Sequence, residues 1–167
     1  MGLNQETLEQ LAAELGAALQ ARGWQLAAAE SCTGGWAAQA MTAVAGSSAW
    51  FDRGFVTYSN EAKMDMLGVS ADTLARFGAV SEATVLSMAE GALRNSRAQA
   101  AFAISGIAGP TGGSDSKPVG TVCFAWAVVG EPTEVATMWF DGDRQLVRIQ
   151  SVEYVFRQML GRLLAVQ

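Results

Sequence analysis

The sequence predicts a three-layer α/β/α sandwich, in which helices cover both faces of a mixed, largely parallel sheet. Segments with helical and with strand character alternate along the chain, and helical segments occupy both ends. The last two strand-like segments are joined by a short turn, which is typical of a hairpin and makes the sheet mixed. Because 50% of the 167 residues are hydrophobic, a sizeable core is possible, and we expect one domain over residues 1–167.

The first helix is predicted at residues 4–22, where leucines at spacings of three and four form one apolar face and Asn4 is a suitable N-cap. Residues 24–29 are short and apolar, as in a buried strand. A turn at 31–35 leads into an Ala-rich helix at about 33–44.

Aromatic and β-branched residues predict the next strand at residues 50–59. Three helices follow, and each begins beside a residue that can accept hydrogen bonds from the first helical turn. These are Asn60 for residues 61–67, Ser70 for a helix ending at Phe77, and Ser81 for a helix reaching about Ser96.

The last part of the chain begins with a buried strand at residues 100–104, which runs into a glycine-rich segment at 105–114. Long glycine-rich loops in a small domain are more often binding loops than simple connections. Two strands at 119–129 and 134–140 are predicted to form the hairpin, and Asp143 can cap a final helix that ends near Leu164.

The composition excludes several kinds of chemistry. The chain has no histidine, which rules out Ser-His-Asp and Cys-His catalysis and zinc bound by histidine. Cys32 and Cys123 fit no zinc spacing and are expected to be reduced thiols in a cytoplasmic protein. With a net charge of -5, the chain is not expected to bind nucleic acid, and no apolar run is long enough to suggest a membrane span.

The turn after the first strand carries Glu30, Ser31 and Thr33 within four residues, followed by Gly34. A strand-turn-helix arrangement directs backbone N–H groups and a helix start toward one point, which favours anions and developing negative charge. We therefore expect this stretch to form the floor of an active site. Ser31 can be a nucleophile, although a serine here can equally be a helix cap.

Without histidine, a lysine whose pKa is lowered by burial is the natural base for a serine. Lys63 is the candidate, and Tyr58 can orient it or relay a proton from the same cleft. Ser48 is a second candidate nucleophile, because the turn before its strand can place its hydroxyl near Lys63. The alternative for Lys63 and Tyr58 is a solvated helix lysine and a packed tyrosine.

Substrate binding is predicted at the glycine-rich loop and at nearby polar residues. Glycines allow a backbone to approach a ligand closely, although this loop matches neither common nucleotide-binding template. The candidates for substrate contacts outside the serine turn are Asn60, Ser105, Gly106, Gly109, Lys117, Thr121 and Arg144. Of these, Lys117, Thr121 and Arg144 are the candidates for phosphate contacts.

Six segments in the same order resemble the CinA C-terminal domain family over about residues 5–162. They are AESCTGG (29–35), GSS (46–48), GFVTYSNEAK (54–63), GAVS (78–81), SGIAGP (105–110) and KPVGT (117–121). The resemblance implies hydrolysis of the carboxamide of nicotinamide mononucleotide by a serine nucleophile and a lysine base. It implies Ser31 or Ser48 as nucleophile, Lys63 as base and Tyr58 as assistant, in a stand-alone form of the domain.

These expectations imply a small nucleotide as substrate and require neither a metal nor an organic cofactor. We also expect a homodimer. The alternative function is a non-catalytic nucleotide-binding or regulatory module linked to competence or the damage response. Ammonia release from nicotinamide mononucleotide separates the two.

Overall fold

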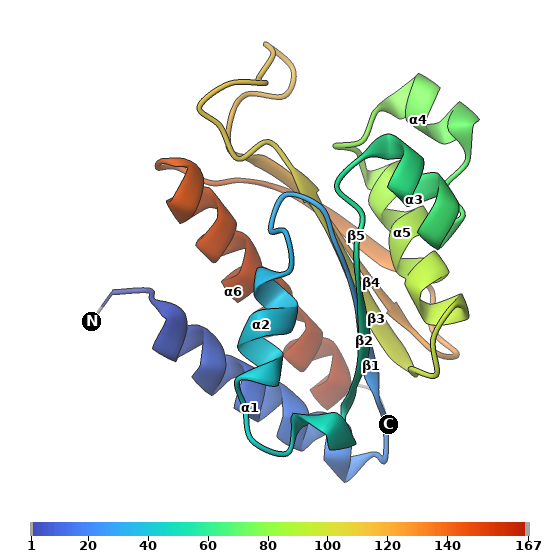
Figure 1. The fold of residues 1–167 in the computed structure, drawn as a ribbon, viewed down its shortest axis with the longest axis vertical. Coiled ribbons are helices and arrows are strands. Elements are labelled where there is room, and N and C mark those ends of the chain that lie inside the picture. Colours follow the sequence, from blue (N-terminus) through green and yellow to red (C-terminus); the bar gives the residue numbers. More distant parts are fainter. Residues whose placement is uncertain (1, 166–167) are drawn as a thin grey trace.

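The structure, a computed structural model, describes residues 2–165 and contains one five-stranded sheet with helices on both faces (Figure 1). Within that range no helix combines the length and the apolar character needed to cross a membrane. The elements are α1 (Gln5–Ala21), β1 (Leu26–Glu30), α2 (Trp36–Thr42), the 3-10 helix η1 (Ser47–Ala49), β2 (Phe51–Val56), α3 (Asn60–Leu67), α4 (Ala71–Phe77), α5 (Glu82–Arg94), β3 (Ala100–Gly106), β4 (Thr121–Val128), β5 (Glu134–Trp139) and α6 (Arg144–Ala165).

The strands lie in the order β2-β1-β3-β4-β5. β1 pairs in parallel with β2 and with β3, while β4 runs antiparallel to both β3 and β5. All strands except β4 therefore point the same way, and the predicted mixed, largely parallel sheet is confirmed. The parallel strands end at one edge of the sheet, so the segments that follow β1, β2 and β3 meet there.

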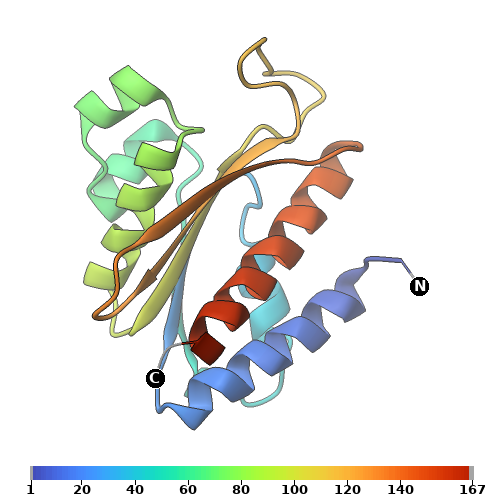
Figure 2. The ribbon, with the colours of Figure 1, turned by 180° about the vertical axis from the view of Figure 1, so that it is seen from behind.

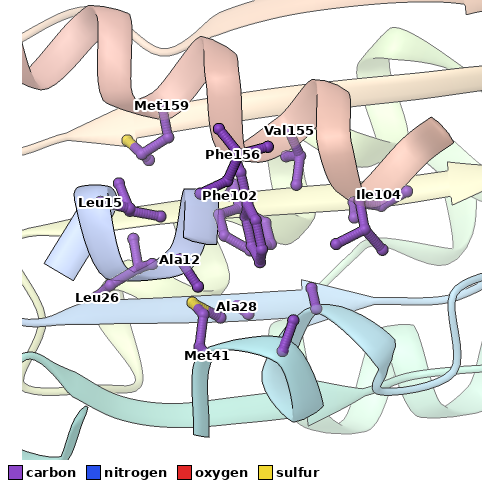
Figure 3. Close-up of a cluster of buried hydrophobic side chains, with 14 of the residues drawn as sticks. Ala12, Leu15, Leu26, Ala28, Met41, Phe102, Ile104, Val155, Phe156 and Met159 are labelled. Carbon is purple, nitrogen blue, oxygen red and sulfur yellow. The ribbon is translucent and has the colours of Figure 1, made fainter. Parts of the chain in front are cut away.

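Helices cover both faces of the sheet (Figures 1 and 2), and a separate hydrophobic core lies on each face. Side chains alternate along β1, because successive residues of a strand point to opposite faces. Leu26 and Ala28 face α1, α2 and α6, where Phe102 and Phe156 also lie (Figure 3). Ala27 and Ala29 face the opposite core, which α5 covers. Small alanines in β1 let helices pack closely on both sides.

The caps account for most element boundaries. Asn4, Ser70 and Ser81 cap α1, α4 and α5 as predicted. The predicted cap of α3 was wrong by one residue, because Ser59 accepts the hydrogen bond from the Ala62 N–H and Asn60 is the first helical residue. The strand predicted at residues 50–59 is shorter in the structure, where β2 spans Phe51–Val56, because the chain leaves the sheet to form this cap.

Candidate active site

Ser31 follows β1 directly and lies on the face of the sheet that carries α3 and α5. The alternation along β1 accounts for this, because Ala27 and Ala29 already face that side. Two backbone bonds hold the residue in place: its N–H donates to the Ile104 carbonyl at 3.0 Å, and its carbonyl accepts from the Gly34 N–H at 3.0 Å. Ser31 is almost fully buried, with 7% of its surface exposed.

Lys63 reaches the Ser31 hydroxyl from α3. Its Nζ lies 3.1 Å from Ser31 Oγ and donates to the carbonyl oxygen of Thr57 at 2.9 Å. Only 1% of Lys63 is exposed, and within residues 2–165 it forms no ion pair with a carboxylate. The structure thus brings together these two predicted residues, which are 32 positions apart in the sequence.

The surroundings of Lys63 favour the neutral amine. Burial removes water from the ammonium group and lowers the pKa of Lys63 below its ordinary value of 10.5, and the nearby Cys32 opposes this only partly. A neutral amine in hydrogen-bond contact with a serine hydroxyl can accept its proton, which is the arrangement of an activated nucleophile. Cys32 lies next to Ser31, but burial raises the pKa of its thiol to about 12, so it stays protonated at neutral pH.

A cleft of about 320 Å³ opens above this pair. It is lined by the segments that follow β1, β2 and β3, the end of β3, α3, the connection between α4 and α5, and the start of α6. The lining residues are Ser31, Cys32, Tyr58, Asn60, Lys63, Ala79, Val80, Ser105, Gly106, Ile107, Ala108, Gly109, Thr111, Gly112 and Arg144. The close approach at Gly106 requires glycine, because an added Cβ would lie 2.7 Å from the Val122 side chain. Asn60, Ser105, Gly106, Gly109 and Arg144 therefore lie where a substrate can touch them.

Tyr58 also lines the cleft, but its hydroxyl contacts an arginine. Tyr58 is 62% exposed, and its OH accepts from Arg144 Nη2 at 3.2 Å. Arg144 Nη1 donates to the carbonyl of Gly109 at 2.7 Å. Arg144 therefore joins the segment after β2 to the glycine-rich loop across the mouth of the cleft.

Glu30 and Thr33 face away from the cleft, toward α2. The Glu30 carboxylate accepts from the Thr33 hydroxyl at 2.6 Å and from the N–H groups of Ala37 and Ala38 at 2.9 and 3.0 Å. It therefore occupies the helix start that we expected to attract an anion. Glu30, Thr33 and Gly34, which we expected to contact the substrate, do not line the cleft, and the alternation along β1 sends Glu30 to the opposite face.

Replacing Glu30 with Gln is expected to lower the free energy of unfolding by about 2–4 kcal/mol, because a buried charged acceptor is lost and an amide NH₂ would face other donors. Binding of a ligand in the cleft should change little, because Glu30 does not line it. Urea denaturation compared with steady-state kinetics at one temperature would check this. An unchanged stability with a large rise in KM would show that Glu30 binds substrate.

Two other predicted contacts lie outside the cleft. Lys117 Nζ donates to the carbonyl of Phe77 at 3.0 Å and ties the glycine-rich loop to the end of α4. The Thr121 hydroxyl donates to the carbonyl of Pro118 at 2.6 Å within the loop. Neither side chain lines the cleft, so the structure does not bring these two residues together with Ser31 and Lys63. Both stabilise the loop conformation instead.

Ser48 lies at the opposite end of the parallel strands, in η1 before β2. Leu26 at the start of β1 pairs with Phe51, whereas Glu30 at its end pairs with Val56. The length of β1, about 15 Å at roughly 3.3 Å per residue, therefore separates Ser48 from the Ser31 end. The expectation that the Ser48 hydroxyl lies near Lys63 was wrong, because a residue that precedes a parallel strand cannot meet one that follows it.

Sequence reasoning missed Arg148, which holds the Ser31 turn from α6. Its Nε donates to the Cys32 carbonyl at 3.0 Å and its Nη2 to the Thr33 carbonyl at 3.1 Å. Its guanidinium also lies over the Trp36 ring, 5.3 Å from the centroid. The spacing of four from Arg144 could have indicated a shared helix face. Throughout residues 2–165, no three His, Cys, Asp or Glu side chains are grouped closely enough to hold a metal ion.

Comparison with known proteins gives consistent matches over nearly the whole chain. Residues 8–163 match the family described as the CinA C-terminal domain. The chain is 55% identical to nicotinamide-nucleotide amidohydrolase PncC of Escherichia coli strain K12, over 91% of this chain and 92% of that protein. The PncC protein of Enterobacter agglomerans is 52% identical over 95% of this chain and 96% of its own length. The crystal structure of competence damage-inducible protein A (ComA) from Klebsiella pneumoniae superimposes with a TM-score of 0.92 at 47% identity, covering 96% of this chain and 99% of that one.

Proposed function

Because the chain belongs to the CinA C-terminal domain family, we propose that it hydrolyses nicotinamide mononucleotide to nicotinate mononucleotide and ammonia, with Ser31 as nucleophile and Lys63 as general base. The names of the PncC relatives support the substrate and the reaction. The observation that carries the mechanism is the 3.1 Å contact between the buried Lys63 amine and the Ser31 hydroxyl.

In the first half of the reaction, the neutral Lys63 amine takes the proton of Ser31 as Oγ attacks the carboxamide carbon. The tetrahedral intermediate collapses when the C–N bond breaks, and the Lys63 ammonium returns the proton to the departing nitrogen, so that ammonia leaves. In the second half, Lys63 takes a proton from water, the water oxygen attacks the ester, and Ser31 Oγ leaves with the proton from Lys63. The products are nicotinate mononucleotide and free enzyme.

The backbone N–H of Cys32 is the donor best placed to stabilise the oxyanion. It comes directly after the nucleophile, which is the position that supplies an oxyanion-hole N–H at nucleophile turns. The peptide that contains it is fixed from its other side, because the Ser31 carbonyl accepts from the Gly34 N–H. A donor of this kind typically lowers the barrier by about 3–4 kcal/mol.

The pH dependence of kcat/KM is expected to show one rising limb that belongs to Lys63. The active form is the neutral amine, and burial lowers the pKa of Lys63, so the rate should rise with pH through a midpoint that lies below 10.5. Ammonia release measured between pH 5 and 10, in the range where the fold is stable, would show this limb. A rate that falls from pH 7 to pH 9 would contradict a lysine base.

Ammonia release from nicotinamide mononucleotide by the purified protein is the test of the proposed function. We expect stoichiometric formation of ammonia and nicotinate mononucleotide with no added metal or cofactor. Tight binding of the mononucleotide without ammonia release would instead support the non-catalytic nucleotide-binding module.

A further inference from the structure

A second hollow lies beside the cleft, between the start of α2 and the start of α6. It measures about 430 Å³ and is lined by Trp36, Arg144, Gln145 and Arg148; we call it the arginine hollow. Arg144 lines both the arginine hollow and the cleft. The two cavities are therefore neighbours, and Arg144 forms part of the wall of each.

Two cationic groups in this hollow have no anionic partner. In the described part of the chain, neither Arg144 nor Arg148 forms an ion pair with a carboxylate. The nearby Asp141 and Asp143 carboxylates accept from the backbone N–H groups of Gly142 and Leu146 instead. Arg144 and Arg148 are four residues apart on α6, so their side chains lie on the same helix face, and both line this one hollow.

Each guanidinium is positioned by bonds that leave part of it available. Arg144 donates to the Gly109 carbonyl and the Tyr58 hydroxyl, and Arg148 donates to the carbonyls of Cys32 and Thr33. Because guanidinium has more N–H groups than these bonds use, both can still donate to an anion. Fixed guanidinium groups lose little side-chain entropy when they bind a phosphate.

The cleft itself has no comparable site for a phosphate. Its charged side chains are Lys63, which is neutral in the proposed mechanism, and Arg144. Lys117 is held at the Phe77 carbonyl, away from the cleft. In a protein with a net charge of -5, binding a dianion requires a local concentration of positive charge, and the arginine hollow supplies it next to the candidate nucleophile.

We propose that Arg144 and Arg148 together bind the phosphate of the mononucleotide in the arginine hollow, so that the carboxamide reaches into the cleft toward Ser31. This inference rests on the proposed function and deepens it, because it assigns the recognition of a nucleoside monophosphate over the corresponding nucleoside. Arg148, which the sequence pattern did not suggest, becomes a residue that determines specificity.

The test compares two ligands that differ only in the phosphate, nicotinamide mononucleotide and nicotinamide riboside. Calorimetric binding is measured with Ser31→Ala, which cannot turn the mononucleotide over, and with the double variant Ser31→Ala/Arg148→Met. Loss of Arg148 should weaken mononucleotide binding about 10- to 100-fold, as expected for charge-assisted hydrogen bonds. Riboside binding should change less than about twofold.

Arg94→Met in the same background is the matched control, because Arg94 also donates to a backbone carbonyl, that of Leu67, but lies on α5 away from both cavities. It should leave both affinities unchanged. Equal weakening of both ligands by Arg148→Met would overturn the inference, since Arg148 would then act only through the Ser31 turn. Unchanged affinity of Arg148→Met for both ligands would also overturn the inference. Ammonia release by the unmodified protein, measured in parallel, reports separately on the proposed function.

Discussion

Ser31→Ala is expected to lower kcat for ammonia release from nicotinamide mononucleotide by about 10⁴-fold or more, because the group that forms the covalent bond is removed. The KM or the binding constant should change little, since the Ser31 hydroxyl contacts Lys63 and not the arginine hollow. The fold should persist, because the two backbone bonds of Ser31 do not involve its side chain. Steady-state kinetics and a urea denaturation curve would measure both effects.

Ser48→Ala is the matched control for this variant. The same hydroxyl is removed, but from an exposed residue at the other end of the parallel strands. We expect kcat within about twofold of the unmodified protein, in line with the small effects of surface substitutions. Loss of activity in Ser48→Ala together with retention in Ser31→Ala would reverse the assignment of the nucleophile.

Lys63→Met is expected to lower kcat by about 10² to 10⁴-fold, which is the usual contribution of a positioned general base. Methionine keeps an unbranched chain in the buried site and removes the amine. Lys117→Met is the control, because it removes the other lysine of the chain, whose amine also donates to a backbone carbonyl but lies outside the cleft. Retained activity in Lys63→Met would exclude the lysine as base.

The same variant has a predicted effect on stability. The pKa of Lys63 is lower in the folded protein than its ordinary value of 10.5. Between these two pKa values the unfolded chain binds a proton that the folded protein does not, so the free energy of unfolding rises with pH through that window. Lys63→Met lacks the amine that causes this rise. Its free energy of unfolding, relative to that of the unmodified protein, should therefore decline as the pH is raised from 7 toward 10. Urea denaturation at several pH values would show it.

Much of the site can be derived from the sequence, first by excluding residue types that the chain lacks and then from the alternation of side chains along a strand. Because the chain has no histidine, we expected a buried lysine to be the base for a serine nucleophile, and Lys63 follows the strand beside Ser31. Glu30 could also have been assigned correctly, because a strand sends neighbouring residues to opposite faces and Glu30 and Ser31 cannot both face one cleft. The direction of the strands also separates Ser48 from Ser31. Ser48 precedes a parallel strand and Ser31 follows one, so the two lie at opposite ends of the strands.

Other features depend on contacts that no local pattern encodes. The position of Lys117 is set by a loop that bends toward the end of α4, and the turn residues alone do not predict that partner. Arg148 meets the Ser31 turn only because α6 packs on the same face of the sheet as α2. Its distance in sequence from Cys32, 116 positions, hides the contact until the layers are assembled.

Identification of the acylated residue tests the central claim most directly. The protein is mixed with nicotinamide mononucleotide, quenched in acid within the first turnover, digested and analysed by mass spectrometry. We predict a nicotinate mononucleotide ester on the peptide that contains Ser31, and its accumulation should be lost in Lys63→Met. An ester on Ser48 or on any other residue would contradict the assignment of Ser31 and Lys63 as the reacting pair.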